Sequence, residues 1–527
     1  MNILRCAFAG AAMTLSVVSG ALAADLPVKA RSAQYLKICS QYGAGFFYIP
    51  DTDTCIKLGG FLRIDTTFNG NVYGLPAWSG DLGQGNRYFD YFVGRSRLGV
   101  TVDTRTDTPY GLLRAFGQFD LQFNNFSTAN PTALTTTSFG TPFGLNSGLL
   151  SNAGGGYVPV DPVFIQFAGF TIGKSASAYA TPWHGYPGNN TSYLMGGHDT
   201  VTGVNNIQYT AQFGNGVTGS VGLDDPTVFN RTVLFNLSTG TNAVGLGANA
   251  YAGTRAPDVV GRIRVDQAWG LVQFSVAAHE VAASYNALAF SASPTNSSET
   301  SGHPDAKWGG SAMAALQIKN IPTGANDDFK IEASYARGIT KNVISTSTSS
   351  PSFAMFGGSS RAGAYQSIGF GATTDAVFLP AFAGGTGDLK LTTSYGLRGA
   401  FNHNWNPFWS SSLFGSASAV RYAGNASDIT TAMGQYCTSY IASTGGLATK
   451  SADFRCNPNF NVYQAGFVTR WTPVKNLTFS GEVQFVALDQ KFTGTSVLPA
   501  AAPKPATVYE YKNQNTAYLN VRVQRNF

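Results

Sequence analysis

Four arginines and one aspartate stand on the polar side of three alternating segments near the N-terminus. Arg63 and Asp65 belong to "CIKLGGFLRIDTTF", Arg95 and Arg97 to "YFVGRSRLGVTVDTR", and Arg114 to "GLLRAFGQFDLQF". Apolar and polar residues alternate along each segment, which predicts a β-strand with one apolar and one polar face. The chemistry that such a group offers is electrostatic, because clustered guanidinium groups attract anions through their field.

The arginines are expected to face water rather than an apolar medium. Charge on a lipid-facing side near mid-membrane would cost about 2–4 kcal/mol. Asp65, Asp103 and Asp120 share the polar faces and offer an alternative, in which all of these charges are simply solvated and balanced. Asp103 and Asp120 lie toward opposite strand ends, so Asp65 is expected to be the nearest counter-charge. Further wall candidates are Arg262, Arg264 and Arg398.

The sequence offers no catalytic constellation, so no enzyme and no cofactor are expected. His279 and His403 have no partner at a spacing typical of catalysis, and no local G-x-S-x-G elbow is present. "GNGVTG", Gly214–Gly219, fits a dinucleotide motif but lies between two alternating segments instead of opening a helix. We therefore interpret it as a turn.

The cysteines indicate an oxidising compartment and no metal. Apart from Cys6, they form two local pairs, Cys39 with Cys55 and Cys437 with Cys456. An even number of cysteines in an exported protein is typical of disulfides. A zinc site would need close C-x-x-C pairs, and none occurs.

The whole chain repeats one rhythm, in which alternating segments are joined by short turns and long polar loops in turn. Seven short turns and eight long loops join sixteen predicted strands. The turns are predicted at Thr106–Pro109, Gly169–Phe170, Gly214–Gly216, Gln267–Gly270, Ile321–Asp327, Asn404–Pro407 and Pro473–Asn476. The loops are predicted at 69–88, 125–160, 180–202, 224–256, 281–307, 338–388, 423–460 and 489–513. This pattern predicts an all-β fold, a transmembrane antiparallel up-and-down β-barrel with 16 strands.

Both ends of the chain fit this prediction. Residues 1–23 have the form of a signal peptide, with Arg5, an apolar run and an Ala-Leu-Ala cleavage site. Residues 24–55 are expected to form a segment closed by a disulfide, and 56–527 the barrel with long extracellular loops. The alternating run "NTAYLNVRVQRNF" is expected to close the barrel against the first strand, with the aromatic ring of Phe527 at the periplasmic rim.

Composition excludes several other classes of protein. Charged residues make up only 12% of the chain, against about 25% in typical soluble proteins. A set of soluble β-sandwiches would need more surface charge and domain linkers. The formal net charge of +6 is small and scattered, so nucleic acid is not an expected partner.

The chain also resembles the porins of alphaproteobacteria. The resemblance rests on "YLKICSQYGAGFFYIPDTDTCIKLGGFLR", "VFIQFAGFTIGKSAS", "GRIRVDQAWG" and "NVRVQRNF", and it extends from about Ala24 to Phe527. It implies a homotrimeric, sixteen-stranded porin that passes small hydrophilic solutes. It also implies that the third long loop folds into the barrel as the constriction, and that "SRLGVTVDT" supplies a wall arginine, which favours Arg97.

The loop that this resemblance assigns to the constriction departs from the acidic loop of general porins. In "ATPWHGYPGNNTSYLMGGHDT", 180–200, the only acid is Asp199, and His184 and His198 accompany it. An arginine cluster facing so few acids is expected to favour small anions. The two histidines would add positive charge below about pH 6.5 if they line the pore.

The function expected from the sequence is passive diffusion of small hydrophilic solutes and ions across the outer membrane of a Gram-negative bacterium. The expected partners are outer-membrane lipids, the other subunits of a homotrimer and the solutes themselves. Two alternatives remain open, a substrate-selective channel of the same fold and a surface adhesin or receptor barrel.

Overall fold

The computed structural model describes residues 37–71, 73, 92–124, 155–157, 160–199, 201–226, 231–287, 299–346, 350–500 and 504–527. The predicted signal peptide, 1–23, lies outside these residues. No helix of the described residues is long and apolar enough to cross a membrane.

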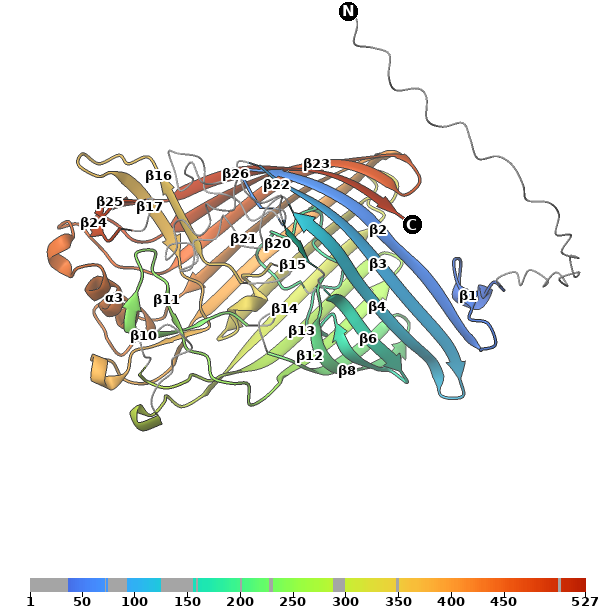
Figure 1. The fold of residues 1–527 in the computed structure, drawn as a ribbon, viewed down its shortest axis with the longest axis horizontal. Helices are drawn as coiled ribbons and strands as arrows, with labels where there is room; N and C mark the ends of the chain where they lie inside the picture. Colours follow the sequence, from blue (N-terminus) through green and yellow to red (C-terminus); the bar gives the residue numbers. More distant parts are fainter. Residues whose placement is uncertain are drawn as a thin grey trace, which may run out of the picture.

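The described strands form one large antiparallel sheet that closes into a barrel (Figure 1). The sheet has 18 strands, of which β1 (Phe47–Tyr48) and β5 (Gly155–Tyr157) are short additions to β2 and β4. The other 16 form the ring. They are β2 (Thr54–Phe68), β3 (Phe92–Thr108), β4 (Gly111–Asn124), β6 (Val160–Phe167), β7 (Phe170–Ser175), β8 (Val204–Gly214), β9 (Val217–Asp224), β12 (Asp258–Gln267), β13 (Gly270–Val281), β14 (Lys307–Lys319), β15 (Asp328–Arg337), β20 (Thr393–Asn406), β21 (Trp409–Arg421), β22 (Phe460–Val474), β23 (Leu477–Gln490) and β26 (Gln514–Asn526). The predicted strand number is confirmed.

The barrel closes where β2 pairs with β26, and we call this line of pairing the seam. Phe61 lies opposite Asn526 and Phe68 lies opposite Leu519, in an unbroken antiparallel register. The predicted closure is therefore confirmed. Closure leaves no free sheet edge along these residues, which a strand in lipid could not tolerate.

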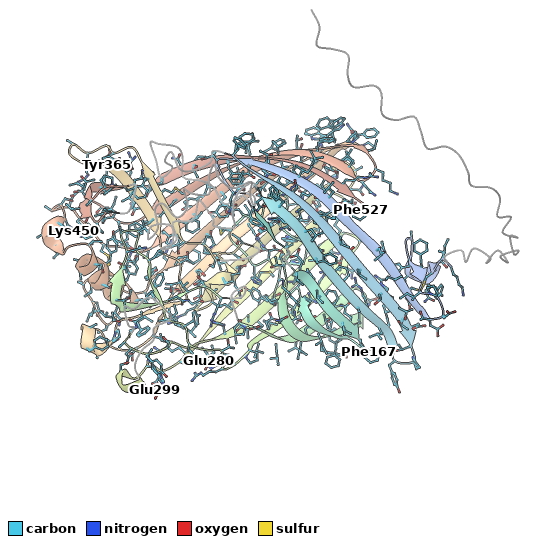
Figure 2. The ribbon with its side chains drawn as sticks, in the orientation of Figure 1. Phe167, Glu280, Glu299, Tyr365, Lys450 and Phe527 are labelled. Atoms are coloured by element: carbon cyan, nitrogen blue, oxygen red, sulfur yellow. A yellow bond between two sulfur atoms is a disulfide. The ribbon has the colours of Figure 1, made fainter. Side chains whose placement is uncertain are left out.

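Side chains alternate between the two faces of the barrel wall as the sequence pattern predicts. On β2, Leu62 and Ile64 are exposed on the outer face, whereas Asp65 and Thr67 are fully buried on the inner face. Figure 2 shows side chains projecting from the outer surface along the length of the barrel. The outer face is thus apolar and the lumen is polar, as a bilayer requires.

Long and short connections lie at opposite ends of the barrel. The short turns are 109–110, 168–169, 215–216, 268–269, 320–327, 407–408 and 475–476. We call the long connections L1 to L8 in chain order: 69–91, 125–159, 176–203, 225–257, 282–306, 338–392, 422–459 and 491–513. Each lies close to its predicted position. In Figure 2, Tyr365 of L6 and Lys450 of L7 lie at one end, and Phe527 lies toward the other.

L4, L6, L7 and L8 fold together over the mouth of the barrel, and we call this assembly the cap (Figure 1). Its described residues form two small sheets and one α-helix. The first sheet consists of β10 (Leu234–Thr241), β11 (Gly247–Asn249), β18 (Ala376–Phe378) and β19 (Lys390–Leu391), the second of β16 (Phe353–Gly357), β17 (Gln366–Gly371), β24 (Thr495–Leu498) and β25 (Thr507–Tyr511), and the helix is α3 (Ala432–Ser443). Phe370, Tyr440, Phe492 and Tyr511 pack ring against ring inside it. The sequence predicts polar loops here and gives no sign that they share a buried core. In the described part of the chain, the 3-10 helices are η1 (Ser40–Tyr42), η2 (Glu299–Ser301), η3 (Thr340–Asn342), η4 (Ala381–Ala383) and η5 (Leu447–Thr449).

Both predicted disulfides are confirmed. Cys39 is bonded to Cys55 at the start of β2, and the two Cα atoms are 6.1 Å apart. Cys437 of α3 is bonded to Cys456, with a Cα–Cα distance of 5.8 Å, and both lie in L7. The first bond anchors the segment before the barrel, and the second braces the cap.

Candidate pore constriction

L3 lies inside the barrel and spans it from one wall to another. The carbonyl of Ala180 accepts a hydrogen bond of 2.7 Å from Gln273 Nε2 on β13. Farther along the loop, Thr191 Oγ1 donates to Glu482 Oε1 on β23 at 2.5 Å. Because β13 and β23 lie far apart around the ring, L3 must cross the lumen and narrow it. The inward fold predicted for the third long loop is therefore confirmed.

Wall side chains satisfy the backbone of L3 where it is buried. The carbonyl of Tyr193 accepts hydrogen bonds from Gln464 Nε2 at 3.1 Å and Gln484 Nε2 at 3.0 Å. The carbonyl of Leu194 accepts from Arg398 Nη1 at 3.0 Å. A loop buried without such partners would carry a large desolvation cost. These bonds hold L3 against β20, β22 and β23.

Two glycines allow L3 to lie directly against the wall. A Cβ atom at Gly188 would lie 2.6 Å from Ala400 Cβ and 2.9 Å from Asn402 Oδ1. A Cβ at Gly197 would overlap the carboxylate of Glu332. Neither position has room for a side chain, so the glycines set how closely the loop approaches the wall.

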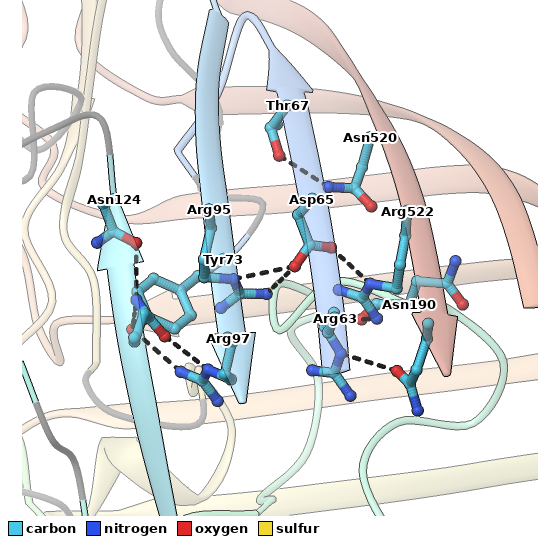
Figure 3. A network of polar contacts seen from close by, with 12 residues as sticks. Arg63, Asp65, Thr67, Tyr73, Arg95, Arg97, Asn124, Asn190, Asn520 and Arg522 are labelled. Carbon is cyan, nitrogen blue, oxygen red and sulfur yellow. Dashed lines mark hydrogen bonds and ion pairs between the residues drawn. The ribbon is translucent and has the colours of Figure 1, made fainter. Parts of the chain in front are cut away.

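Asp65 is the centre of an arginine cluster at the seam (Figure 3). Its Oδ2 accepts hydrogen bonds from Arg95 Nε at 2.9 Å and Nη2 at 2.5 Å. Its Oδ1 accepts from Arg522 Nε at 2.5 Å. Arg522 also donates through Nη1 to the carbonyl of Asn190 at 2.8 Å, so the cluster contacts the tip of L3. One carboxylate thus orients two guanidinium groups beside the constriction loop.

Arg63 and Arg97 lie opposite each other on β2 and β3, but they differ in their partners. Arg97 forms an ion pair of 2.7 Å with Asp120, so the expectation that Asp65 is the nearest counter-charge is wrong for this arginine. Arg63 donates to the neutral Gln524 Oε1 at 2.8 Å, and no carboxylate of the described residues lies within 4.0 Å of it. Arg63 therefore contributes a less compensated positive charge than Arg97.

The structure does not bring Arg114 into this cluster. On β4, Arg114 lies opposite Arg105, whereas Gln122 of the same strand lies opposite Arg97. Eight residues of strand correspond to about 26 Å. Arg114 pairs instead with Asp103 at 2.9 Å near the short-turn end. It lines the vestibule rather than the constriction.

The structure buries His198 and Asp199 of L3 instead of exposing them to the passage. Their exposed fractions are 1% and 3%. Burial, followed by the charges of Lys341 and Arg398, lowers the pKa of His198 well below 6.5. Burial raises the pKa of Asp199 to about 7. Neither side chain therefore presents a charge to a solute in the lumen.

His184 is exposed, yet it is unlike a free histidine. Surrounding protein atoms and the charge of Arg63 lower its pKa. Across the lumen, Arg264 donates to the carbonyl of Pro182 at 3.1 Å, and Arg262 donates to Ser220 at 2.7 Å. Of these two further wall candidates, Arg264 thus lies against L3, whereas Arg262 binds the neighbouring strand β9; both are away from the seam.

Sequence reasoning missed two arginines at the constriction. Arg522 falls on the polar parity of "YLNVRVQRNF" and could have been found from that pattern. Arg470 of β22 donates to Asn190 Oδ1 at 3.2 Å and Ser412 Oγ at 2.8 Å. Its position gives no comparable signal, because only the placement of L3 shows what it contacts.

A closed ring of 16 antiparallel strands, apolar outside and polar within, with a loop folded across its lumen, defines a transmembrane β-barrel of the porin type. The chain belongs to the porin family, because the family described as "Porin subfamily" matches residues 25–519. Membership of this family places it in the outer membrane of a Gram-negative bacterium.

Curated relatives and solved structures agree with this assignment. The chain is 28% identical over 286 residues to Porin Omp2b of Brucella suis, a match that covers 53% of this chain and 66% of the relative. It is 28% identical over 282 residues to Porin Omp2b of Brucella abortus (strain 2308), with the same coverage. The match thus spans slightly less than two thirds of these relatives. Among solved structures, the outer membrane channel DcaP of Acinetobacter baumannii has a TM-score of 0.54 and 13% identity, and the alignment covers 91% of this chain and 99% of DcaP. The likeness to DcaP shows the fold alone.

Proposed function

We propose that the protein is a passive diffusion channel for small hydrophilic solutes and ions, with a modest preference for anions. The observation that carries this proposal is the arginine cluster at the seam, which faces a constriction loop whose single acid, Asp199, is buried. Passage requires only partition into a water-filled lumen, and wall charge sets which ions enter.

The balance of charge around the tip of L3 supports an anion preference. The guanidinium groups are those of Arg63, Arg95, Arg97, Arg470 and Arg522. The carboxylates are those of Asp65, Asp120 and Glu482. Positive groups exceed negative groups by two, and Coulomb energy in a confined, partly desolvated pore exceeds its value in bulk water.

A planar bilayer with a KCl gradient tests the proposal. The reversal potential should lean toward chloride at low salt and approach neutrality as salt rises, because screening shortens the reach of the charges to about 8 Å at physiological salt. A potassium preference at low salt would contradict the anion preference. The absence of any conductance would contradict the channel itself.

A swelling assay distinguishes the proposed diffusion channel from the two alternative functions, a substrate-selective channel and an adhesin or receptor barrel. Liposomes that contain a diffusion channel should swell in neutral sugars at rates that fall smoothly with solute size. A substrate-selective channel would pass one solute much faster than others of its size, and an adhesin or receptor barrel with a plugged lumen would pass none.

The assembly that we propose is a homotrimer embedded in outer-membrane lipids. Membership of the porin family and the apolar outer face of the barrel support this state. Native mass spectrometry from mild detergent should give three times the mass of the chain, and a monomer under the same conditions would exclude the trimer.

A further inference from the structure

A recess lies between the tip of L3 and the wall made by β15, β20, β21 and β22. Its volume is about 340 Å³, and residues 186–189 of L3 form one side of it. The wall side relevant here consists of Asp328, Lys330, Asn402, Ser410, Ser412 and Arg470. This volume is at the lower end of the range of about 300–1,000 Å³ that is typical of ligand pockets.

The recess contains a guanidinium group whose hydrogen-bond acceptors among the described residues are all neutral. Arg470 donates to three neutral acceptors, Ser412 Oγ at 2.8 Å, Asn190 Oδ1 at 3.2 Å and the carbonyl of Gly188 at 2.5 Å. Within the described part of the chain, no carboxylate oxygen lies within 4.0 Å of it. A carboxylate of a solute would form stronger, charge-assisted hydrogen bonds with this group than its neutral acceptors do.

A second cation in the recess is only loosely paired. Lys330 Nζ lies 3.4 Å from Asp328 Oδ2. Asp328 already accepts hydrogen bonds from Asn402 at 2.6 Å and from Gln317. Because these amides share the carboxylate, the ammonium of Lys330 retains capacity for another acceptor.

The recess also lies on the route past the constriction. Arg470 is opposite Ser480, Ser480 is opposite Arg522, and Arg522 is opposite Asp65, so these residues form one row across four strands. The recess reaches toward the short-turn end, because Asn326 and Asn404 also line it. A solute that passes the seam cluster therefore meets the recess on the periplasmic side of L3.

We propose that this recess is a binding subsite for small hydroxylated carboxylates of about the size of a sugar acid. Arg470 and Lys330 bind the carboxylate, and Asn402, Ser410 and Ser412 bind hydroxyl groups. The proposal rests on the proposed function, since the ligand must first diffuse through the pore. It adds a brief retention step for one chemical class of solute.

Single-channel recording of the full chain in KCl tests the subsite, with D-gluconate as the probe on the periplasmic side. Gluconate should interrupt the current in a concentration-dependent way. Sorbitol, which lacks the carboxylate, and hexanoate, which lacks the hydroxyls, should interrupt it at least about tenfold more weakly, because each loses a set of hydrogen bonds.

Variants separate the recess from the rest of the lumen. Lys330→Gln should weaken the gluconate effect about tenfold, measured relative to the gluconate-free KCl current of the same variant, because the substitution removes one of the two cations that bind the carboxylate. L3 should stay in place, because the ion pair of Lys330 is with its own strand and not with L3. Arg470→Gln should weaken the gluconate effect further. Lys319→Gln is the matched control, because Lys319 pairs with Asp266 outside the recess and should leave gluconate binding unchanged.

These experiments distinguish a failure of the subsite proposal from a failure of the channel proposal. Without KCl conductance in the unmodified protein, the channel proposal fails. With normal conductance, equal interruption by gluconate and sorbitol, or equal interruption in Lys330→Gln and the unmodified protein, would show that the recess is not the subsite.

Discussion

Oδ1 of Asp65 on β2 lies 2.5 Å from Nε of Arg522 on β26, so an ion pair joins two residues 457 positions apart in the sequence. The same carboxylate binds Arg95 of β3, and Asp65 is completely buried. One side chain thus links the first two strands to the closing strand and also limits the net charge of the constriction.

Replacing Asp65 should affect both roles. Asp65→Asn leaves Arg95 and Arg522 without a shared carboxylate, so the reversal potential in a KCl gradient should move further toward chloride. Breaking a buried ion pair costs about 3–5 kcal/mol, and the denaturant midpoint should fall accordingly. Asp103→Asn is the control, because its pair with Arg114 is partly exposed and lies away from the seam. Equal effects of both variants would refute a special role for Asp65.

Arg63 should contribute more to ion preference than Arg97. Arg97 is paired with Asp120 at 2.7 Å, whereas Arg63 donates its hydrogen bond to the neutral Gln524 and lies over the ring of Phe61. Arg63→Gln should therefore shift the reversal potential toward potassium more than Arg97→Gln does, with both variants measured in the same low-salt gradient. A larger shift for Arg97→Gln would mean that pairing does not govern the field.

The sequence predicts the barrel well because each strand carries its own signal. Period-2 alternation assigns Leu62 to the outer face and Asp65 to the lumen without any knowledge of neighbouring strands. Turn position and strand number follow from the same rhythm. The seam is predictable because a sheet in lipid must close.

The constriction is predicted less completely, because it depends on register and on the path of L3. Parity places Arg114 in the lumen, but only the register of β3 with β4 shows that it lies far from Arg97. The composition of L3 suggests that His198 and Asp199 line the pore. Their burial depends on how the loop packs against Arg398 and Lys341, which no local pattern encodes.

The pH dependence of ion preference should be weak between pH 7.5 and 5.5. The sequence alone predicts that His184 and His198 add positive charge below about pH 6.5 if they line the pore, but the pKa of each is lowered. Surrounding protein atoms and the charge of Arg63 lower the pKa of His184, and burial with the charges of Lys341 and Arg398 lowers that of His198. Each therefore gains its proton at a lower pH than an ordinary histidine, and His198 is also buried away from the lumen. The reversal potential should therefore hardly change. A shift toward chloride at pH 5.5 that disappears in His184→Gln would contradict this.

Stability, in contrast, should depend on His198. Its pKa is lower in the folded state than in the unfolded chain, so below about pH 6.5 the unfolded chain binds more protons and stability falls as pH falls. Between the folded-state pKa and the unfolded-state pKa, the free energy of unfolding falls by about 1.4 kcal/mol for each pH unit. His198→Phe should remove this contribution. The denaturant midpoint of the variant should therefore rise relative to that of the parent protein as the pH is lowered from 7 to 5.

The disulfide in L7 should stabilise the cap and leave the barrel unaffected. Cys437 and Cys456 are separated by 19 positions, and closing such a loop contributes about 3 kcal/mol in the chain-entropy model. The double variant Cys437→Ser, Cys456→Ser should become sensitive to protease within L7, while the sixteen-stranded ring stays intact. Limited proteolysis with peptide mass analysis measures this. The double variant of Cys39 and Cys55 is the control, and cleavage in L7 there would exclude a local effect.

Phe527 should matter for assembly through both its backbone and its ring. Its N–H donates to the carbonyl of Gly60 at 3.0 Å, and the N–H of Gly60 donates to its carbonyl at 3.1 Å, so Phe527 extends the seam by one pair. Its ring is 62% exposed, as expected for the aromatic girdle at the membrane interface.

Deleting Phe527 removes both hydrogen bonds, each with a net value of about 0.5–1.5 kcal/mol, together with the aromatic anchor. The amount of folded protein in the outer membrane should drop strongly. Phe527→Ala keeps the backbone pair and loses only the ring, so its level should be intermediate, and Phe527→Tyr should match the parent. Membrane fractionation followed by heat-modifiability on gels gives the folded amount. If the protein without Phe527 reached the same folded amount in the outer membrane as the parent protein, the pairing at Gly60 and the aromatic ring would both be dispensable. Assembly would then depend on the strand pairing from Phe61 to Phe68 alone.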